Sequence, residues 1–224
     1  VPYGHFIGRK KEIDQIESIL SKRGESNVMV VGQPGVGVHP LMIHLAKLID
    51  EGRVYPQLEF KRMMRLDLEK LFGASNDRNQ QKAILADILE EARGAGNVVL
   101  VIDQFDRYVT SRQDRIDISD VFIHAASDHR LQLIALVTPG SFEQFIQPNQ
   151  SLMNIFETVE VSEPSPSETL LILQTILPEF EARGVFFPYT TLKATVHLTD
   201  RYIQDMPFPE KAIEVLDNAT TFAS

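Results

Sequence analysis

Cysteine and tryptophan are both absent from the 224-residue sequence. Without cysteine the chain can form neither a disulfide framework nor a cysteine-based zinc site. Its histidine pairs also have spacings that suit no common metal site. No apolar run approaches the roughly 18 residues that a membrane span requires. We therefore expect a cytoplasmic protein that holds no metal and has no membrane segment within this part of the chain.

The sequence also contains fewer basic than acidic residues. The 22 Lys and Arg residues are outnumbered by 31 Asp and Glu residues, which gives a formal net charge of −9 at pH 7. Proteins that bind nucleic acid regardless of its sequence rely on Lys and Arg to neutralise the phosphates. The charge balance therefore argues against nucleic acid as a partner.

What the sequence does contain is an alternation of short apolar runs with helix-patterned segments. Two runs, NVVLVID and LQLIALVT, are almost continuously apolar, which is typical of parallel strands covered on both faces. The alternation predicts an α/β fold with a three-layer parallel sheet and right-handed crossovers. The expected strands are 28–31, 63–68, 98–102, 131–137 and 158–161, and the expected helices among them are 10–22, 41–51, 78–93 and 116–126.

The pattern changes after residue 161. The stretch SEPSPSE, residues 162–168, predicts a linker because its two prolines interrupt regular structure. Ser165 or Ser167 can cap the helix that follows. Beyond the linker only helical patterns occur, over 167–183, 189–199 and 208–218. We therefore expect a large α/β domain over residues 1–161 and a small all-helical domain over residues 162–224.

A glycine-rich stretch, GQPGVG, follows the first expected strand. Gly32 and Gly37 have the spacing of a phosphate-binding loop, G-x-x-x-x-G-K-[ST], set between a strand and a helix. Together with Gly35 they allow successive backbone N–H groups to surround an anion. The stretch therefore predicts the backbone shape of a phosphate loop.

The side chains that follow this loop do not match the motif. Val38 and His39 stand where the motif has Lys and then Ser or Thr. Valine carries no charge, and a neutral imidazole is a poor ligand for Mg²⁺, which prefers hard oxygen donors. Pro40 also lacks a backbone N–H in the first helical turn. The sequence thus predicts a loop that keeps its shape and has lost most of its phosphate chemistry.

Several segments together resemble the first ATPase module of the Clp-type unfoldases, in the AAA+ superfamily. FIGRKKEIDQIESIL resembles the opening of that module, GQPGVG its phosphate loop, and NVVLVIDQFDRYV its Walker B strand. IDISDVFIHAASDHRLQLIALVT resembles the helix and strand that come next, and RYIQDMPFPEKAIEVLDNA the closing helix of its small domain. The resemblance covers almost the whole chain. It implies an AAA+ fold that meets other protein subunits in a homo- or hetero-oligomeric ring.

The resemblance also implies roles for positions at the strand ends. Asp103 matches the acidic residue that coordinates Mg²⁺ through water, and Gln104 matches the glutamate that activates the attacking water. An amide cannot accept the proton of that water at neutral pH. Val137 matches a polar residue that senses the outermost phosphate. Thr138 is one step further along, where alternation places it on the opposite face of the strand.

Two further groups of positions depart from the family pattern. Asn154 and Ile155 match a pair of arginines that reach the site of the neighbouring subunit, and residues 131–162 contain no Arg or Lys. Such arginine fingers are worth about 10³–10⁵ in related phosphoryl transfers. Asn76 and Asp77 match the Lys and the aromatic residue that grip substrate polypeptide in the pore, and only the arginine that follows them is retained.

The family resemblance and the substitutions together predict a catalytically degenerate module for assembly or protein interaction, with no required cofactor and weak binding of ATP or ADP at best. One alternative is a slow or unusual ATPase of a protein-remodelling Clp-type chaperone. A second is an AAA+ protein acting on nucleic acid, which the net charge disfavours. The positions that remain for nucleotide binding are Ile7, Gly8, Gly32, Gly35, Gly37, Asp103 and Lys211.

Overall fold

The computed structural model describes residues 8–22, 24, 26–73, 77–109, 117–126 and 130–223. The chain divides into two units, which we call the sheet unit and the helical unit. The sheet unit comprises Glu12–Gly32 and Leu45–Glu160, and the helical unit comprises Val1–Lys11, Gln33–His44 and Val161–Ser224. Of the described residues, none belongs to a helix long and apolar enough to cross a membrane.

Five parallel strands form the sheet, in the order β2-β3-β4-β1-β5. They span Val28–Gly32 (β1), Arg62–Leu66 (β2), Val98–Ile102 (β3), Gln132–Val137 (β4) and Glu157–Val161 (β5). Every residue of β1, β3 and β4 is buried, as their apolar runs predict for strands covered on both faces. The predicted α/β fold with a parallel sheet is confirmed.

The edge strand β2 ends two residues before the predicted strand 63–68 does. The strand stops at Leu66 because Asp67 begins the next helix, α3 (Leu68–Gly73). The Asp67 carboxylate accepts a hydrogen bond of 3.0 Å from the backbone N–H of Lys70, and this bond lowers the pKa of Asp67. An acidic cap of this kind satisfies an N–H in the first turn, where helices otherwise leave donors unpaired.

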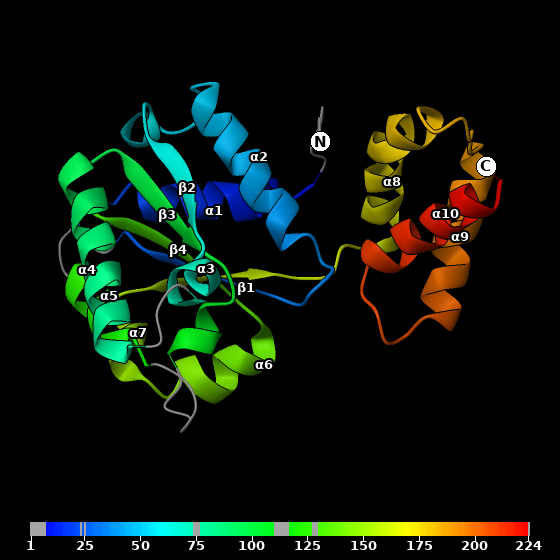
Figure 1. The fold of residues 1–224 in the computed structure, drawn as a ribbon. Coiled ribbons are helices and arrows are strands. Elements are labelled where there is room, and N and C mark those ends of the chain that lie inside the picture. Colours follow the sequence, from blue (N-terminus) through cyan, green and yellow to red (C-terminus); the bar gives the residue numbers. More distant parts are fainter. Residues whose placement is uncertain are drawn as a thin grey trace. The chain divides into compact units, whose positions relative to one another are not determined.

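Helices surround the sheet (Figure 1). They span Lys10–Leu20 (α1), Val38–Asp50 (α2), Arg78–Ala95 (α4) and Ser119–Ala126 (α5), with shorter turns at Pro56–Leu58 (η1), Phe105–Tyr108 (η2), Pro139–Ser141 (α6), Phe142–Ile146 (η3) and Gln150–Met153 (α7). Helix α2 begins at Val38, three residues before the predicted start, because Leu41 already donates its N–H to the carbonyl of Gly37 at 3.1 Å. Proline is tolerated in such a first turn, so Pro40 does not delay the helix.

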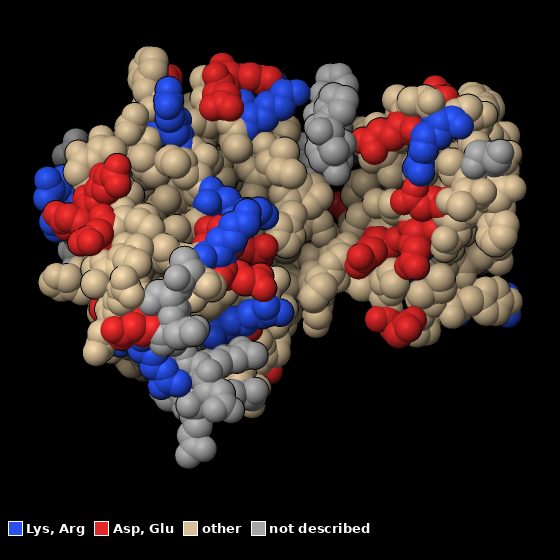
Figure 2. All heavy atoms as spheres, viewed as in Figure 1, with Lys and Arg blue, Asp and Glu red and all other residues tan. Residues whose placement is uncertain are grey.

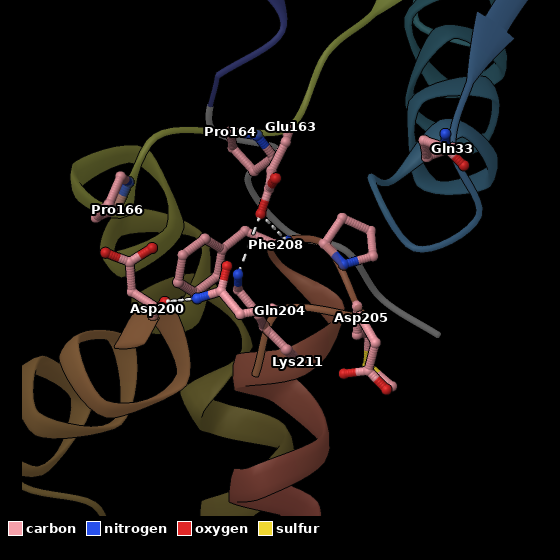
Figure 3. A pocket seen from close by; sticks show the side chains of 11 residues that line it. Gln33, Glu163, Pro164, Pro166, Asp200, Gln204, Asp205, Phe208 and Lys211 are labelled. Carbon is pink, nitrogen blue, oxygen red and sulfur yellow. Dashed lines mark hydrogen bonds and ion pairs between the residues drawn. The ribbon is translucent and has the colours of Figure 1, made fainter. Parts of the chain in front are cut away.

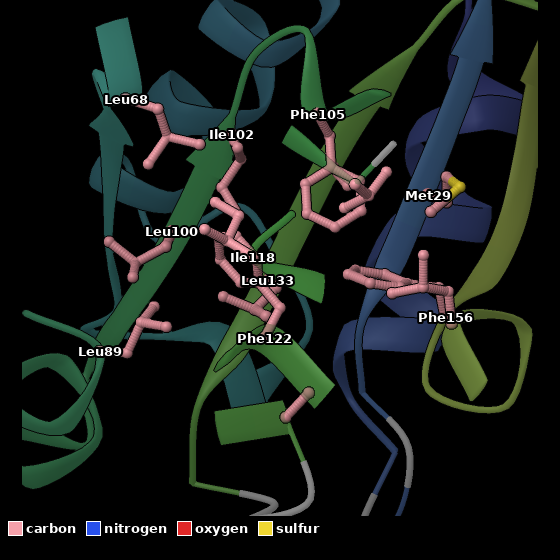
Figure 4. Packing of buried hydrophobic residues seen from close by; sticks show 14 of the residues in the cluster. Met29, Leu68, Leu89, Leu100, Ile102, Phe105, Ile118, Phe122, Leu133 and Phe156 are labelled. Atoms are coloured by element: carbon pink, nitrogen blue, oxygen red, sulfur yellow. The ribbon is translucent and has the colours of Figure 1, made fainter. Parts of the chain in front are cut away.

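The main core lies on the face of the sheet covered by α4 and α5 (Figure 4). Phe105 is fully buried at its centre. Its ring centroid lies 5.1 Å from that of Phe122 and 5.6 Å from that of Phe156, and both pairs are edge-to-face. Such pairs contribute about 0.5–1.5 kcal/mol beyond their buried area. Phe105 is the third residue after β3, so this packing also holds the segment that leaves the end of that strand.

The described residues from 162 onward form the helices α8 (Pro166–Glu181), α9 (Tyr189–Tyr202) and α10 (Glu210–Ala223). Ser165 caps α8 in a capping box with Glu168, which confirms one of the two predicted caps. Helix α10 begins at Glu210, two residues after the predicted start, because Pro207 and Pro209 hold the segment before it in a non-helical turn. The helices share a core made of Leu173, Phe180, Phe187, Leu192, Val196, Phe208, Ala212 and Leu216.

Glu17 allows the stability of the sheet unit to be tested as a function of pH. This α1 residue is only 5% exposed, and its carboxylate accepts a hydrogen bond of 3.3 Å from the N–H of Tyr55. Burial raises the pKa of Glu17 above its usual value of 4.5, and the nearby charge of Asp14 adds to the increase. The folded state therefore binds the Glu17 proton more tightly than the unfolded state, so stability falls as pH rises from 4.5 through the folded pKa.

Glu17→Gln keeps a side-chain oxygen that can accept from Tyr55 and removes the charge. We expect the variant to be more stable than the parent at pH 8 and to lose this advantage toward pH 4. The gain should reach its full size only above the folded pKa of Glu17, which burial raises. Urea denaturation at several pH values measures it, with the exposed Glu91→Gln as a control. An equal gain in both variants would contradict the assignment.

Candidate functional site

The predicted phosphate loop leaves the carboxyl end of β1 after Gly32 and runs to the start of α2. Gly35 and Gly37 have φ values of 90° and 97°, in the region that only glycine adopts readily. Val36, between them, is buried and donates its N–H to the carbonyl of Gln33 at 3.3 Å. The two positive-φ glycines therefore give the segment a tight turn that is closed by the Val36 N–H.

The first residues of α2 add little charge to this loop. Val38 is partly buried, and His39 is exposed. The start of the helix contributes a partial positive charge equivalent to about half an elementary charge. Residues 38–40 carry no Lys or Arg, so the start of α2 itself offers an anion only its backbone dipoles.

Two charged side chains of the helical unit contact the loop. Arg9, which follows Gly8 in the opening segment, donates from Nη2 to the carbonyl oxygen of Val36 at 2.9 Å. Glu210, the first residue of α10, lies against Gly35: a Cβ placed on this glycine would meet Cδ of Glu210 at 2.9 Å and its Cβ at 3.0 Å. The loop is thus in contact with one cationic and one anionic side chain, and neither position belongs to the phosphate-loop motif.

Asp103 and Gln104 follow β3 at the carboxyl edge of the sheet. Asp103 is partly buried, whereas Gln104 is exposed. Gln104 has a φ of 50° and starts the turn η2, in which the N–H of Arg107 binds its carbonyl oxygen at 3.0 Å. This left-handed turn directs the next residue, Phe105, into the core. The local structure therefore leaves the Gln104 amide free of the core and available to solvent.

Val137 and Thr138 end the neighbouring strand, β4. Val137 is 5% exposed and belongs to the main hydrophobic core. The hydroxyl of Thr138 accepts a hydrogen bond of 3.3 Å from the N–H of Ser141 and so caps α6. Val137 therefore contributes packing, and Thr138 stabilises a helix start.

Asn154 and Ile155, which match the arginine pair, differ in their surroundings. Asn154 is exposed at the end of α7. Ile155 is partly buried against the main core, and its carbonyl accepts a hydrogen bond of 3.2 Å from the buried side chain of Asn27. Asn27 also accepts from the N–H of Leu133 at 2.9 Å. These contacts tie Ile155 to the beginning of the central strands.

The predicted pore positions are only partly described. Asp77 caps α4, because its carboxylate accepts from the N–H of Asn79 at 2.9 Å, and Arg78 is the first residue of that helix. Asn76, and Ile7 of the opening segment, lie outside the described residues. Asp77 thus has a structural role in the described part of the segment.

Lys211 lies beside a cavity of about 560 Å³ in the helical unit (Figure 3). Its ammonium is 3.4 Å from the Glu163 carboxylate, 3.3 Å from the carbonyl oxygen of Ile203 and 4.1 Å from the centroid of the Phe208 ring. Glu163 also accepts a hydrogen bond of 2.6 Å from the N–H of Phe208. Lys211 therefore closes a local network between the linker and the start of α10.

Charge is distributed unequally over the surface. In Figure 2 acidic and basic side chains interleave on the sheet-containing part, whereas acidic side chains predominate on the visible face of the helical part. Residues 162–224 contain nine Asp and Glu and four Lys and Arg, so this part carries much of the net negative charge. Among the described residues, no group of three or more His, Asp or Glu is placed to hold a metal ion.

The sequence comparisons match both parts of the chain. A family described as the AAA lid domain matches residues 165–224. The chaperone protein ClpB of Oceanobacillus iheyensis is 32% identical over 216 residues, which cover 95% of this chain and 27% of ClpB. ClpC of Staphylococcus aureus strain USA300 is 32% identical over 218 residues, or 96% of this chain and 27% of ClpC. The chain thus spans about a quarter of the length of these curated relatives.

Solved structures share the fold. Hsp104 of Saccharomyces cerevisiae, in its extended conformation with casein, superposes with a TM-score of 0.88 at 23% identity, over 97% of this chain and 38% of that one. The Hsp104–ADP complex gives the same TM-score at 24% identity, over 97% and 31% of the two chains. The α/β part with its small helical domain is therefore an AAA+ fold with a helical lid.

The packing of Ile155 can be tested against its exposed neighbour. Ile155→Arg places a guanidinium against the core or withdraws the side chain from it, and either change should lower the free energy of unfolding by about 1–3 kcal/mol. Asn154→Arg should change it by about 0.5 kcal/mol or less, because the site is exposed. Urea denaturation followed by circular dichroism compares the two. Equal stability of both variants would show that Ile155 does not need to remain in the core.

Proposed function

We propose that this chain, a Clp-like AAA+ module, assembles with other protein subunits and does not hydrolyse ATP. The observation that carries the proposal is Val38 at the first position of α2. In the phosphate-loop motif this position holds the lysine that reaches the outer phosphates. Gly35 and Gly37 keep the positive φ values of a tight loop, but the Val38 side chain that follows them offers no charge to a nucleotide.

The positions at the sheet edge support the same proposal. Gln104 is exposed after β3, where the family has its general base, and losing a positioned base removes roughly 10²- to 10⁴-fold of rate. Val137 lies in the core instead of presenting a polar sensor. Ile155 also packs against the core instead of extending an arginine toward a neighbouring subunit. Catalytic groups act as a unit. These substitutions lie on separate segments, and each of them favours the loss of ATP hydrolysis.

We propose other protein chains as partners. The relatives include a chaperone, and one solved structure of similar fold was captured with casein. We therefore place this module in a homo- or hetero-oligomeric ring of a larger chaperone-like machine, where it supplies a folded subunit and a surface for neighbours. The net charge of −9 disfavours nucleic acid as a partner.

A slow ATPase is the second candidate, because Asp103 remains at the strand end where the family coordinates Mg²⁺. Carboxylate oxygen is a suitable ligand for that ion, and the glycine loop is formed. ATP or ADP would then bind at this loop, with Asp103 as the remaining acidic group. Without a general base, such an enzyme would still lack the group that activates the attacking water.

The first test is ATP turnover by the chain. We expect phosphate release at the background rate, because Val38 supplies no charge and Gln104 no base. Asp103→Ala should leave that rate unchanged. Phosphate release measured with and without Mg²⁺ over a range of ATP concentrations decides the question. A saturable, Mg²⁺-dependent rate that disappears in Asp103→Ala would establish the slow-ATPase alternative instead.

The second test separates nucleotide binding from hydrolysis. Restoring the motif with Val38→Lys and His39→Thr should strengthen ATP binding about 10- to 100-fold, since a charge-assisted hydrogen bond contributes about 1.5–3 kcal/mol. Hydrolysis should stay at background, because Gln104, Asn154 and Ile155 are unchanged. Calorimetry measures the affinity, and phosphate release the rate. Turnover by the double variant at the rate of an ordinary Clp module would show that these three positions do not limit the reaction.

A further inference from the structure

Strand β2 lies at one end of the five-stranded sheet and, among the described strands, pairs with β3 alone. The N–H of Arg62 donates to the carbonyl of Asn97 at 2.8 Å, and the backbone groups of successive residues in a strand point to opposite sides. Those of Arg62 and Met64 therefore face β3, whereas those of Met63 and Arg65 face away from the sheet. The outer edge of β2 thus presents backbone donors and acceptors to an additional strand.

The side chains of β2 are basic although the whole chain is acidic. The strand contains Arg62 and Arg65, both exposed, and no Asp or Glu. Their separation of three residues places the two guanidinium groups on opposite faces of the sheet. Asp67 follows the strand, but its carboxylate caps α3 at the N–H of Lys70, and Arg65 contributes less than Lys70 to the lowered pKa of Asp67. A strand added at this edge would meet positive charge on both faces, which favours acidic side chains in it.

An exposed aromatic side chain precedes β2 by two residues. The N–H of Lys61 donates to the carbonyl of Leu58 at 3.2 Å. Between them Glu59 has φ −57° and ψ 137°, and Phe60 has a φ of 66°. These values match a type II turn, in which the position of Phe60 usually requires glycine. Phe60 is nevertheless 88% exposed, so packing in the described part of the chain does not offset its backbone strain. Strain that is kept in this way indicates a functional contact of Phe60.

We propose that the outer edge of β2 is a docking site for an extended acidic segment of another protein chain, which adds a further strand to the sheet. Backbone hydrogen bonds to Met63 and Arg65 hold the segment, and the arginines select its acidic side chains. Phe60 and Met64, which is 54% exposed, contact its apolar side chains. The same edge of a second copy is disfavoured, because arginines on both strands repel. The inference concerns one edge of a single chain, so it is independent of ring assembly and of ATP hydrolysis.

The probe is the hexapeptide Glu-Val-Glu-Glu-Val-Glu, titrated into the isotope-labelled 224-residue chain and followed by NMR. Its sequence reads the same in both directions and places acidic side chains on both faces of an extended strand. We expect saturable shifts of the amide signals of Met63 and Arg65 and slower hydrogen exchange of these two N–H groups. The same peptide with every peptide nitrogen methylated, and Lys-Val-Lys-Lys-Val-Lys, should each bind at least about fivefold more weakly.

Variants at Arg65 separate charge from backbone pairing. Arg65→Gln keeps the outward N–H and should weaken peptide binding about two- to fivefold, as expected for the loss of an exposed ion pair. Arg65→Pro also removes the N–H and should weaken binding by about a further two- to tenfold. Proline is tolerated where the N–H of an edge strand faces solvent. Phe60→Gly should weaken binding without lowering resistance to urea, because glycine adopts the positive φ readily.

Arg201→Gln is the matched control, because Arg201 is an exposed arginine of α9 in the helical unit. We expect less than about a twofold change in this variant. Equal effects of Arg65→Gln and Arg201→Gln would overturn the proposal in favour of a general charge effect. Equal binding of the methylated and unmodified acidic peptides would also overturn it, as would no binding of the acidic peptide to a parent chain that is folded by circular dichroism.

Discussion

Burial of β1, β3 and β4 on both faces is the constraint from which the site geometry follows. A strand that is buried along its whole length must satisfy every backbone group in the sheet, so its register with the neighbouring strands is strongly restricted. Because the strands are parallel, their carboxyl ends emerge at one edge. Gly32, Ile102 and Val137 end these three strands, so the segments that follow them start from fixed positions in the sheet.

The shape of the phosphate loop and its chemistry depend on different residues. The shape comes from the positive φ values of Gly35 and Gly37 and from the burial of Val36. Phosphate affinity and Mg²⁺ binding depend on the two side chains after the last glycine, which contribute little to the core. The loop can therefore persist in a folded module whose side chains no longer suit a nucleotide. The same separation applies after β3, where Phe105 packs the core and Gln104 faces solvent.

Sequence reasoning succeeds here where burial or local capping determines structure. The apolar runs predicted β3 to the residue, and Ser165 was one of two serines expected to cap α8. It predicted no element over residues 139–153, where short helical turns are fixed by local caps such as Thr138 and Asn149. The contacts of Glu210 with Gly35 and of Glu163 with Phe208 and Lys211 join distant segments, so no pattern of spacing could reveal them.

The network of Glu163 also gives the linker a mechanical role. Glu163 precedes the two prolines of the linker and is bonded to the N–H of Phe208 and to the ammonium of Lys211. A force applied to the chain at Ser162 therefore reaches α10 through two direct bonds, without first passing through the packing of α8 against α9. The linker and the start of α10 are therefore joined directly, as well as through the packing of the helices.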